Sequence, residues 1–436
     1  MKIALIEPTA SEANIYSKLH MPLLGPIYLG TILRNKGHEV EIYNEDIYRP
    51  DYSKLNADVV GISILTSTAK RGYAIARRFP KEKVIIGGVH ASLLPDEALQ
   101  FARQVVIGEA EEVICDVVEG LNKEPIVYGK PIQNLDSLPY PDFSLVKRYK
   151  TLSWAMPIST SRGCPFDCTF CSVTKMFGRE YRFRSAENVM EELASRDARS
   201  IFFCDDYFTA NPKRTRTLLE LMLKHKIRSW SCQVRCDAAK DEELLGLMAR
   251  AGCAVACVGF ESVNLKTLQT YQKKQSIDDI INAIRSFHKK KIKIHGMFVL
   301  GSDNDSETTI WDTLKFAIKQ KIDTLQMAVL TPLPGTKVHE ELHAQKRIFS
   351  YDWNLYDGQH VVFRPKLLSA KQLQLNVLNA YTKFYSLSRS LSLLMQLHFR
   401  NAMFRFMGYR IVREWIEHNQ KMHWLLKTDT SSPSVI

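Results

Sequence analysis

The sequence predicts an α/β protein with three parts: a doubly wound parallel sheet, an incomplete β/α barrel of six units, and a helical C-terminal segment. Three observations predict this class. Short apolar strands alternate with helical patterns near the N-terminus, the alternation resumes after a proline-rich break, and the last part is helical, basic and aromatic. With 436 residues, the chain also exceeds the usual size of a single core. We expect boundaries at residues 1–127, 128–153, 154–350 and 351–436.

The first part should contain five strands, because runs of Val and Ile end at proline, glycine or polar residues. These strands are residues 2–8, 39–45, 58–65, 83–90 and 104–110. Helical patterns separate them at residues 25–36, 68–79, 95–103 and 111–121. Such alternation predicts a parallel sheet that binds ligands outside the carboxyl ends of its strands. Those ends carry small residues and one carboxylate, namely Ser63, Thr66, Gly87, Gly88, Gly108 and Glu109.

The break over residues 128–153 has no clean period, so we expect a linker that lies over the surface. Six further strands follow it, at residues 157–161, 200–204, 229–235, 254–261, 293–300 and 324–330. Five helices should begin near Ser185, Asn211, Asp241, Ser276 and Ser306, and several of these have good starting signals, such as Ser185 and Ser306. These β/α units suit an incomplete barrel whose working residues lie at the carboxyl ends of its strands.

Composition limits the environment of the protein. No apolar run approaches the length of a spanning helix, and the N-terminus reaches Glu7 and Pro8 after one short strand, so no secretory signal is expected. We therefore expect a cytoplasmic protein, in which clustered thiols favour metal or redox chemistry over disulfides. The net charge of +12 suits nucleic acid, a membrane surface, an anionic substrate or simply a solvated basic surface.

The segment "SRGCPFDCTFCSV", residues 161–173, gathers three of the nine cysteines. Three thiolates lack the fourth ligand of tetrahedral zinc, and the C-x3-C-x2-C spacing departs from the paired C-x2-C of structural zinc sites. Three thiolates on a short loop can instead hold three irons of a [4Fe–4S] cluster and leave the fourth iron open. The loop therefore predicts an iron–sulfur site with one iron available for chemistry.

This loop resembles the radical S-adenosylmethionine (radical SAM) superfamily, whose motif is C-x3-C-x-Φ-C with an aromatic residue at Φ, here Phe170. The resemblance continues through "FFCDDYFTANPKR", "WSCQVRCDA" and "VGFESVNLKTLQ". It implies that Cys164, Cys168 and Cys171 bind a [4Fe–4S] cluster and that SAM chelates the fourth iron, with Phe170 near the adenine. Cleavage of SAM by one electron would give a 5′-deoxyadenosyl radical that takes hydrogen from a substrate. The electron would come from an external reductant of the flavodoxin or ferredoxin type.

The resemblance also implies SAM contacts at three later strand ends. Asp205 and Asp206 end the second barrel strand, where the family binds the SAM amino group, and alternation turns only one of them inward. Gln233 and Arg235 would bind the SAM carboxylate, and Glu261 resembles the carboxylate that binds the ribose. The structural alternatives are a helix cap for the two aspartates and salt bridges at the barrel end for the others.

Alternation on the third strand places Gln233, Arg235 and Asp237 on one face, opposite Cys232 and Cys236. A buried arginine needs an anionic partner, and the SAM carboxylate would be a suitable one.

A second cluster is an alternative for the cysteine pairs 232/236 and 253/257, since a spacing of four puts two thiols on one strand face. Burial as ordinary core residues is the favoured interpretation, because cysteine is among the most buried residue types. Cys257 lies four residues before Glu261 on the same predicted strand and so points to the same side. It is the candidate that would face the barrel interior.

The first part, with "MPLLGPIYLGTILRNKGHEVEIYNED", "GISILTST" and "IIGGVHASLLPDEAL", resembles the N-terminal domain of the cobalamin-binding radical SAM subfamily. The resemblance implies a corrin ligand in the crevice at the strand ends, where glycines let the backbone approach it closely. The D-x-H-x-x-G motif is absent, which removes the lower axial histidine but not the ligand. His90 is expected to be a hydrogen-bonded structural residue. The implied chemistry is methyl transfer to an unactivated carbon of a small-molecule or lipid-like substrate; the subfamily's cyclases and ring-rearranging enzymes are the alternative.

The C-terminal segment mixes apolar and aromatic residues with arginines. If helical, it could lie on a membrane surface as a peripheral contact or pack against the barrel with arginine stems covering apolar surface, and packing is favoured. The residues concerned are Tyr385, Leu387, Leu391, Leu394, Phe399, Phe404, Trp415, Trp424, Arg389, Arg400, Arg405, Arg410 and Arg413.

Two rival functions are weaker. The methylthiotransferases of tRNA carry a second three-cysteine cluster in the first domain, where this chain has only Cys115, and they end in a small β-barrel. Nucleic acid is therefore disfavoured as a substrate. A non-catalytic carrier of iron–sulfur or cobalamin is disfavoured because the positions that contact SAM are retained.

Overall fold

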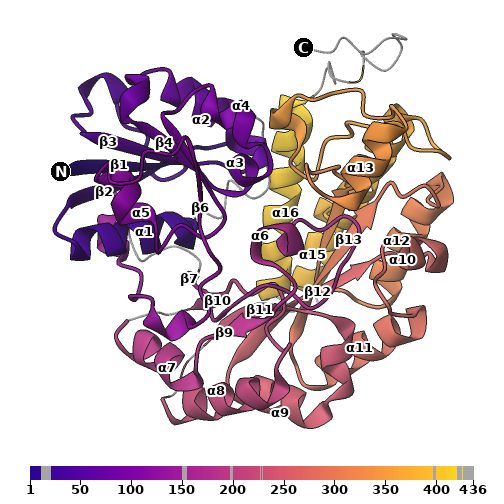
Figure 1. Cartoon of the computed structure of the whole chain (residues 1–436). Coiled ribbons are helices and arrows are strands. Elements are labelled where there is room, and N and C mark those ends of the chain that lie inside the picture. Colours follow the sequence, from indigo (N-terminus) through magenta and orange to yellow (C-terminus); the bar gives the residue numbers. More distant parts are fainter. Residues whose placement is uncertain are drawn as a thin grey trace. The chain divides into compact units, whose positions relative to one another are not determined.

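The computed structural model describes residues 1–10, 21–149, 155–196, 200–225, 227, 229–395, 399–419 and 425 (Figure 1). The chain forms two compact units, which are described separately. The first unit comprises Met1–Ser11, Tyr16–Phe166 and Ser172–Asp206. The second unit comprises Glu12–Ile15, Asp167–Cys171 and Tyr207–Ile436.

The first unit contains a parallel sheet of six strands in the order β2-β1-β3-β4-β5-β6. The strands are β1 (Lys2–Glu7), β2 (Glu39–Asn44), β3 (Val59–Ser63), β4 (Val84–Gly87), β5 (Gln104–Ile107) and β6 (Ile126–Tyr128). Five of them are the predicted strands, and β6 extends the sheet at its edge. The strand order reverses between β1 and β3, so the fold opens a crevice outside the carboxyl ends of these two strands.

Five helices accompany this sheet, and one of them was not expected. They are α1 (Leu24–Asn35), α2 (Ala69–Ala76), α3 (Val89–Leu93), α4 (Pro95–Leu99) and α5 (Ile114–Val118). The sequence predicts one strand over residues 83–90, but the strand ends at Gly87. Gly88 adopts a φ of +93°, which turns the chain out of the sheet and lets α3 begin at the next residue.

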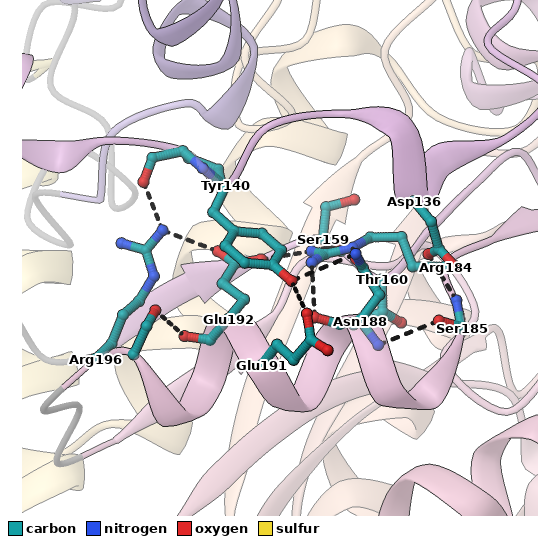
Figure 2. Close-up of polar contacts among 12 residues, drawn as sticks. Asp136, Tyr140, Ser159, Thr160, Arg184, Ser185, Asn188, Glu191, Glu192 and Arg196 are labelled. Atoms are coloured by element: carbon teal, nitrogen blue, oxygen red, sulfur yellow. Dashed lines mark hydrogen bonds and ion pairs between the residues drawn. The ribbon is translucent and has the colours of Figure 1, made fainter.

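The segment predicted as a linker is packed against the first unit. Leu135, Phe143 and Leu145, which lie in two short 3₁₀ turns, are buried. Figure 2 shows the same segment tied to α7 (Ala186–Ala194): the Tyr140 hydroxyl donates to Glu191 Oε2 at 2.8 Å. Residues 150–153 of the predicted linker lie outside the described residues.

Four short strands and a helix surround the start of the cysteine segment in this unit. They are β7 (Met156–Ile158), β8 (Ser161–Arg162), α6 (Val173–Phe177), β9 (Arg182–Phe183) and β10 (Ile201–Phe203). Strands β7 and β10 pair in parallel as expected. The antiparallel pair of β8 and β9 was not predicted, because two residues are too short a run to show a period.

The second unit holds the remaining four predicted barrel strands, which are parallel and paired in chain order. They are β11 (Trp230–Val234), β12 (Cys253–Glu261), β13 (Lys293–Leu300) and β14 (Thr324–Val329). Its helices before the C-terminal segment are α8 (Pro212–Lys224), α9 (Glu242–Arg250), α10 (Leu265–Thr270), α11 (Ile277–Lys289), α12 (Glu307–Lys319) and α13 (Lys337–Ala344). The chain is therefore an α/β protein with two parallel sheets, as the sequence predicts, and each sheet has six strands.

The predicted helix starts are confirmed at the level of single hydrogen bonds. The side chains of four of the five predicted caps, Ser185, Asn211, Asp241 and Ser276, each accept a bond from a backbone N–H three residues on. The fifth, Ser306, directly precedes α12, and its backbone N–H donates to Thr309 Oγ1 at 3.2 Å.

The C-terminal segment is helical, as expected. It contains α14 (Ala370–Phe384), α15 (Leu387–Met395) and α16 (Phe399–His418). Helix α14 is fixed to β14 because the hydroxyls of Tyr381 and Tyr385 bond the strand backbone at 2.6 and 2.8 Å. Among the described residues, no helix combines the length and apolarity needed to cross a bilayer. Trp424 lies outside the described residues.

Candidate active site

The first unit contains a cavity of about 400 Å³ at the carboxyl ends of β1, β3, β4 and β5. Its walls are mostly apolar and include Leu5, Ile62, Ile85, Val106 and Ile114. Five of the six residues predicted from the strand ends line it, namely Ser63, Gly87, Gly88, Gly108 and Glu109. The cavity thus lies where a doubly wound sheet is expected to bind a ligand.

The two adjacent glycines of this cavity serve different purposes. A Cβ on Gly88 would lie 2.7 Å from the carbonyl oxygen of Ile64, and its φ of +93° strains any other residue. A Cβ on Gly87 would meet only the Val106 oxygen, at 3.6 Å. Gly88 is therefore required by the backbone, whereas Gly87 keeps space open in the cavity.

Thr66 and His90 are not among the residues that line the cavity. The ring of His90 is fully buried, with Nδ1 3.4 Å from Thr66 Oγ1 and Nε2 3.4 Å from Glu97 Oε1. His90 is thus hydrogen-bonded and structural, as expected. Of the described residues that line the cavity, none is a histidine.

Glu109 is the centre of a buried ion-pair cluster. Its Oε2 accepts from Arg162 Nη1 at 2.7 Å and from Arg182 Nη1 at 3.0 Å, and the backbone N–H of Ile132 donates to it at 3.0 Å. Burial alone would raise the pKa of this carboxyl, but Arg182 and Arg162 hold it below its ordinary value. Glu109 therefore connects the cavity wall with β8, the strand that leads into the cysteine segment.

Two polar atoms at the cavity have no hydrogen-bond partner among the described residues. They are the hydroxyl of Ser161 and Oε2 of Glu111, whose other oxygen pairs with Arg162 Nη2 at 2.5 Å. Both side chains are more than nine-tenths buried. Because buried polar atoms are nearly always satisfied, these two mark places where a bound molecule with amide or hydroxyl groups would complete the hydrogen bonding.

The two predicted aspartates face different surroundings. Asp205 is buried, and its carboxylate accepts from the backbone N–H groups of Thr160 at 2.6 Å and Ser161 at 3.1 Å and from the Thr160 hydroxyl. Asp206 lines the cavity, and its exposed surface belongs to that wall. Burial and the nearby Asp205 charge raise the pKa of Asp206 to about 7. Only Asp206 is thus available to a ligand, whereas Asp205 positions the strand before the cysteines.

The start of the cysteine segment is held firmly within the first unit. Gly163 adopts a φ of +84°, and a Cβ there would lie 2.1 Å from the carbonyl oxygen of Glu180. Upstream, the guanidinium of Arg184 donates to the Ser159 oxygen at 3.1 Å and to Glu192 Oε2 at 2.5 Å, as drawn in Figure 2. The chain therefore enters the segment in a defined backbone conformation that only glycine tolerates well.

The later half of the segment packs within the second unit. Thr169 donates its backbone N–H to the Tyr271 oxygen at 3.4 Å and accepts from the Val338 N–H at 3.2 Å. The ring of Phe170 meets that of Tyr271 edge to face, with centroids 4.9 Å apart. Asp167 pairs with Lys337 at 2.9 Å. These contacts hold residues 167–171 against Tyr271, which follows α10, and against the start of α13.

Cys168 lies in a strongly charged pocket of the second unit. Lys273, Glu261 and Arg235 are its electrostatic neighbours. Lys273 Nζ is 2.6 Å from Glu261 Oε1, and Arg235 Nη2 donates to the Lys273 oxygen at 2.6 Å. Burial raises the pKa of the Cys168 thiol, while the two cations act in the opposite direction. Lys273 was missed by sequence reasoning, because nothing in "YQKKQS" distinguishes it from a solvated lysine.

Glu261 reaches this pocket through an unusual backbone. Its φ is +62°, and the register of β12 with β13 shifts between Gly259 and Glu261. A Cβ on Gly259 would lie 2.5 Å from Glu261 Oε1 and 2.9 Å from Lys273 Nζ. The bulge aims the carboxylate, and the missing side chain at Gly259 leaves room for the ion pair.

The alternation expected for the third barrel strand stops one residue early. Strand β11 ends at Val234, and Cys236–Lys240 form a 3₁₀ turn, so Arg235 and Asp237 do not share a strand face with Gln233. Arg235 Nε lies 3.5 Å from Asp237 Oδ2. Gln233 pairs in register with Cys257 of β12, which pairs in turn with His295 of β13.

None of the nine cysteines, all of which are described, forms a disulfide. Cys164, Cys168 and Cys171 are half-buried, so the thiols that a three-cysteine cluster requires are present. Among the residues that the structure describes, no three His, Cys, Asp or Glu side chains are gathered closely enough to hold a metal ion. Burial raises the pKa of Cys236 and of Cys257 to about 12, so both thiols stay protonated at neutral pH, as expected of core cysteines.

Two families match parts of the sequence. Residues 158–317 match the radical SAM superfamily, and residues 14–118 match the B12 binding domain. The bacteriochlorophyllide d C-12(1)-methyltransferase of Chlorobaculum tepidum is 30% identical over 405 residues, which cover 88% of this chain and 87% of that protein. The hopanoid C-3 methylase of Methylococcus capsulatus is 26% identical over 84% of this chain and 77% of its own. An anaerobic magnesium-protoporphyrin IX monomethyl ester cyclase from Rubrivivax gelatinosus is 25% identical over 88% of this chain and 77% of its own.

Solved structures share the fold. The cobalamin-dependent S-adenosylmethionine radical enzyme OxsB with aqua-cobalamin bound gives a TM-score of 0.70 at 14% identity, over 97% of this chain and 76% of that one. The radical S-adenosylmethionine methyltransferase TsrM of Kitasatospora setae, with cobalamin and a [4Fe–4S] cluster bound, gives a TM-score of 0.62 at 16% identity, over 79% of this chain and 78% of that one.

Proposed function

Since the chain belongs to the radical SAM superfamily and, within it, to the cobalamin-binding subfamily, we propose that it transfers a methyl group to an unactivated carbon of its substrate. The protein is an enzyme, and its cofactors are a [4Fe–4S] cluster, SAM and cobalamin. When bound, the cluster and SAM supply a 5′-deoxyadenosyl radical that takes hydrogen from the substrate, and cobalamin supplies the methyl group. The chain's own side chains would hold the cluster, SAM and cobalamin in place.

The cavity of the first unit is the observation that carries this proposal. Its apolar walls and the open space at Gly87 suit a large flat ligand, and such a ligand would lie against the backbone at Gly88. Corrin rings carry several amide side chains. Ser161 Oγ and Glu111 Oε2, which lack partners among the described residues, would bond those amides. The residues present therefore fit cobalamin without an axial histidine.

Cys164, Cys168 and Cys171 would hold the cluster. Lys273 and Arg235 place positive charge beside Cys168, which offsets the negative charge that three thiolates bring to one loop. Their role is to hold the thiolate in place and to stabilise its charge. The donor chemistry thus fits an iron–sulfur cluster bound by three cysteines.

Five side chains would then bind SAM. Asp206 would accept hydrogen bonds from the amino group, Glu261 from the ribose hydroxyls, and Phe170 would pack near the adenine. Gln233 and Arg235 would bind the carboxylate, because a guanidinium is a suitable partner for a carboxylate. Asp205 is instead proposed to position the strand before the cysteines.

The substrate is proposed to be a small molecule or a lipid-like compound. The relatives are named for methyl transfer to a bacteriochlorophyllide and to a hopanoid, and both are large, mostly apolar molecules. Ring closure is the second candidate, favoured by the likeness to the monomethyl ester cyclase over most of the chain. RNA is disfavoured, because the described residues from Ala370 to His418 form helices.

The test is anaerobic purification of the full chain with cobalamin, followed by iron, corrin and SAM-cleavage measurements. We expect iron near four atoms per chain, about one corrin, and release of 5′-deoxyadenosine under reducing conditions. Candidate apolar substrates are then offered with SAM labelled in its methyl group, and label should appear in the product.

Three outcomes would overturn the proposal in different ways. A full complement of iron with no corrin would remove methyl transfer and leave the radical SAM core intact. A product with a new ring and no methyl label would establish cyclisation instead. Absence of SAM cleavage in the reduced, reconstituted protein would favour a non-catalytic carrier.

A further inference from the structure

Helices α15 and α16 expose an unusual number of large apolar side chains. Leu391 is 57% exposed, Met395 79% and Phe399 63%. Leu387, Leu394, Met403 and Phe406 are also exposed. We call these seven residues the apolar outer face. Nine other large apolar side chains of the described residues are exposed, but they are scattered along the chain, and nowhere else are they so concentrated.

The spacing of these residues places them on one side of each helix. On α15 they occupy positions i, i+4, i+7 and i+8, beginning with Leu387. On α16 they occupy i, i+4 and i+7, beginning with Phe399. A helix normally turns such a stripe toward the core. Here the stripe faces solvent, so the pattern indicates a surface that meets an apolar partner.

The opposite side of α16 is firmly packed. Ala402, Val412 and Trp415 are buried, and a Cβ on Gly408 would lie 2.3 Å from the ring of Tyr385. Arg405 stacks over the Phe384 ring at 3.7 Å and donates to the Ile322 oxygen at 3.2 Å. One side of α16 thus packs within the second unit, and the apolar outer face stays exposed. The sequence left two alternatives for this segment, packing against the barrel and contact with a membrane surface. In α16 one side packs and the opposite side is exposed.

The charge of the surrounding segment is strongly one-sided. Residues 358–413 contain no aspartate or glutamate. The same stretch contains nine lysines and arginines, namely Arg364, Lys366, Lys371, Lys383, Arg389, Arg400, Arg405, Arg410 and Arg413. This segment therefore accounts for most of the net charge of +12 of the whole chain.

We propose that the apolar outer face docks on the surface of an anionic lipid bilayer. Helices that combine a stripe of Leu, Phe and Met with arginines lie in the interface plane, with the stripe buried about 5–10 Å into the lipid. Arginines near anionic headgroups each add on the order of 1 kcal/mol of attraction. Docking of this kind needs no spanning helix.

Charge and composition favour this partner over two others. A second copy of the chain would bring two faces of the same positive sign together, which repel each other. Nucleic acid would suit the arginines but would leave Leu391 and Met395 exposed, since its surface is charged and its bases stack on aromatic rings. A bilayer satisfies both the apolar and the basic groups.

Docking would also narrow the substrate class. If the proposed function holds, an enzyme seated on a bilayer draws its substrate from the membrane, so the substrate is an amphipathic lipid rather than a freely soluble metabolite. The docking surface itself depends on neither the cluster nor cobalamin. Vesicle binding therefore tests it separately from the chemistry.

The test uses the full chain with its cofactors and measures co-sedimentation with lipid vesicles. We expect binding to phosphatidylcholine vesicles that contain about 30% phosphatidylglycerol, weaker binding without it, and a decrease when salt is raised. The triple variant Leu391→Ser, Phe399→Ser, Met403→Ser should lose at least about tenfold in vesicle affinity. A charge variant, Arg389→Glu with Arg410→Glu, should lose affinity for the anionic vesicles alone.

A matched control variant changes three exposed apolar residues elsewhere. Leu121, Tyr128 and Leu265 are 70%, 71% and 52% exposed, and their replacement by serine should leave vesicle binding unchanged. SAM cleavage in lipid-free buffer reports separately on the core chemistry and should be equal in all variants.

Three results would overturn the proposal. The first is wild-type protein that stays in the supernatant with anionic vesicles at low salt. The second is equal loss of binding in the control variant. The third is a wild-type dimer that the triple variant converts to a monomer without any change in vesicle binding, which would assign the face to self-association.

Discussion

The cavity of the first unit and the pocket around Cys168 in the second unit differ in whether the chain's own side chains fill them. The cavity has apolar walls, empty space at Gly87 and two polar atoms without partners among the described residues. The Cys168 pocket is crowded, and its charges are paired within the chain: Lys273 with Glu261 at 2.6 Å and Arg235 with Asp237 at 3.5 Å. One region is built to be completed by a large ligand, and the other holds its shape by itself.

This difference predicts different responses to substitution. Substitutions in the pocket should lower the free energy of unfolding, because removing one partner of a buried ion pair leaves an unpaired charge in the interior. Changes in the cavity should disturb ligand binding more than stability, because few native contacts are lost there. Four comparisons test whether the two regions really differ in this way.

The largest effect is expected at the cysteine segment. Cys168→Ser should reduce the iron bound after reconstitution to a small fraction of the wild-type amount and abolish SAM cleavage, because serine does not replace a thiolate ligand. Corrin binding in the first unit should remain, since the cavity is lined by other residues. Iron and corrin assays on the same sample measure both.

Cys257→Ser is the matched control for this experiment, because the pKa of its thiol is raised to about 12 and the side chain is not a candidate ligand. It should keep its iron. Equal loss of iron in both variants, or loss of corrin from Cys168→Ser, would contradict the independence of the two regions.

Next in size is the buried ion pair. Lys273→Met leaves the Glu261 carboxylate without its cation, and we expect the free energy of unfolding to fall by about 3 kcal/mol. Adding Glu261→Gln to that variant should restore more than half of the loss, because no buried charge then remains. Urea unfolding of the cofactor-free protein measures both.

Lys274 supplies the control for this pair. It adjoins Lys273 and is exposed, so Lys274→Met should change the free energy of unfolding by less than about 0.5 kcal/mol. A loss of similar size at both lysines would mean that the ion pair contributes nothing specific to the pocket.

The two glycines of the cavity should separate stability from ligand binding. Gly88→Ala forces a side chain into a left-handed conformation 2.7 Å from a carbonyl oxygen, and a loss of about 1–3 kcal/mol in stability is expected. Gly87→Ala meets nothing closer than 3.6 Å and should keep its stability. It should still lower the amount of corrin retained, because its methyl group occupies the cavity.

Thermal unfolding and corrin content, measured side by side, check this contrast. The interpretation of the cavity is wrong if Gly87→Ala retains as much corrin as the wild type while Gly88→Ala loses it only in proportion to its unfolding.

The smallest effect concerns Asp206. Its pKa is raised from 3.8 to about 7 in the folded protein, so the folded state holds the proton more tightly than the unfolded state does. The stability that this protonation contributes is complete below about pH 4 and is lost as the pH rises through about 7. Asparagine resembles the protonated side chain at every pH, so the wild type should become progressively less stable than Asp206→Asn as the pH rises through this range.

The change should be modest, because part of the Asp206 side chain is exposed to the cavity. Glu112→Gln, at an exposed carboxylate of the same unit, provides the baseline. A difference that is independent of pH would mean that Asp206 titrates normally and that the cavity wall does not desolvate it.

Local features of the fold were predictable because they depend on neighbouring residues. The caps at Ser185, Asn211, Asp241 and Ser276 carry their signal within three residues, and the alternating runs mark most of the strands. The cysteine spacing likewise carries its prediction of a cluster site within one short segment.

The partners of the site residues could not be predicted in the same way. Glu109 was named as a cavity residue, but Arg162 and Arg182 lie 53 and 73 residues away, and no local period connects them. Lys273 follows a helix that the sequence did not reveal, and its pairing with Glu261 depends on a left-handed residue after a bulge. Contacts of this kind arise from tertiary packing, which overrides local preference.

Gly259 limits the substitutions that this part of the sequence can accept during evolution. A Cβ at this position would lie 2.5 Å from the Glu261 carboxylate and 2.9 Å from the Lys273 amine. The backbone angles of Gly259 itself would not exclude a side chain. Shorter, uncharged residues at both 261 and 273 would therefore permit alanine at position 259, whereas alanine introduced alone would clash with both side chains. Among descendants of a common ancestor, these three positions should drift together, and an engineer who wishes to alter one should alter all three.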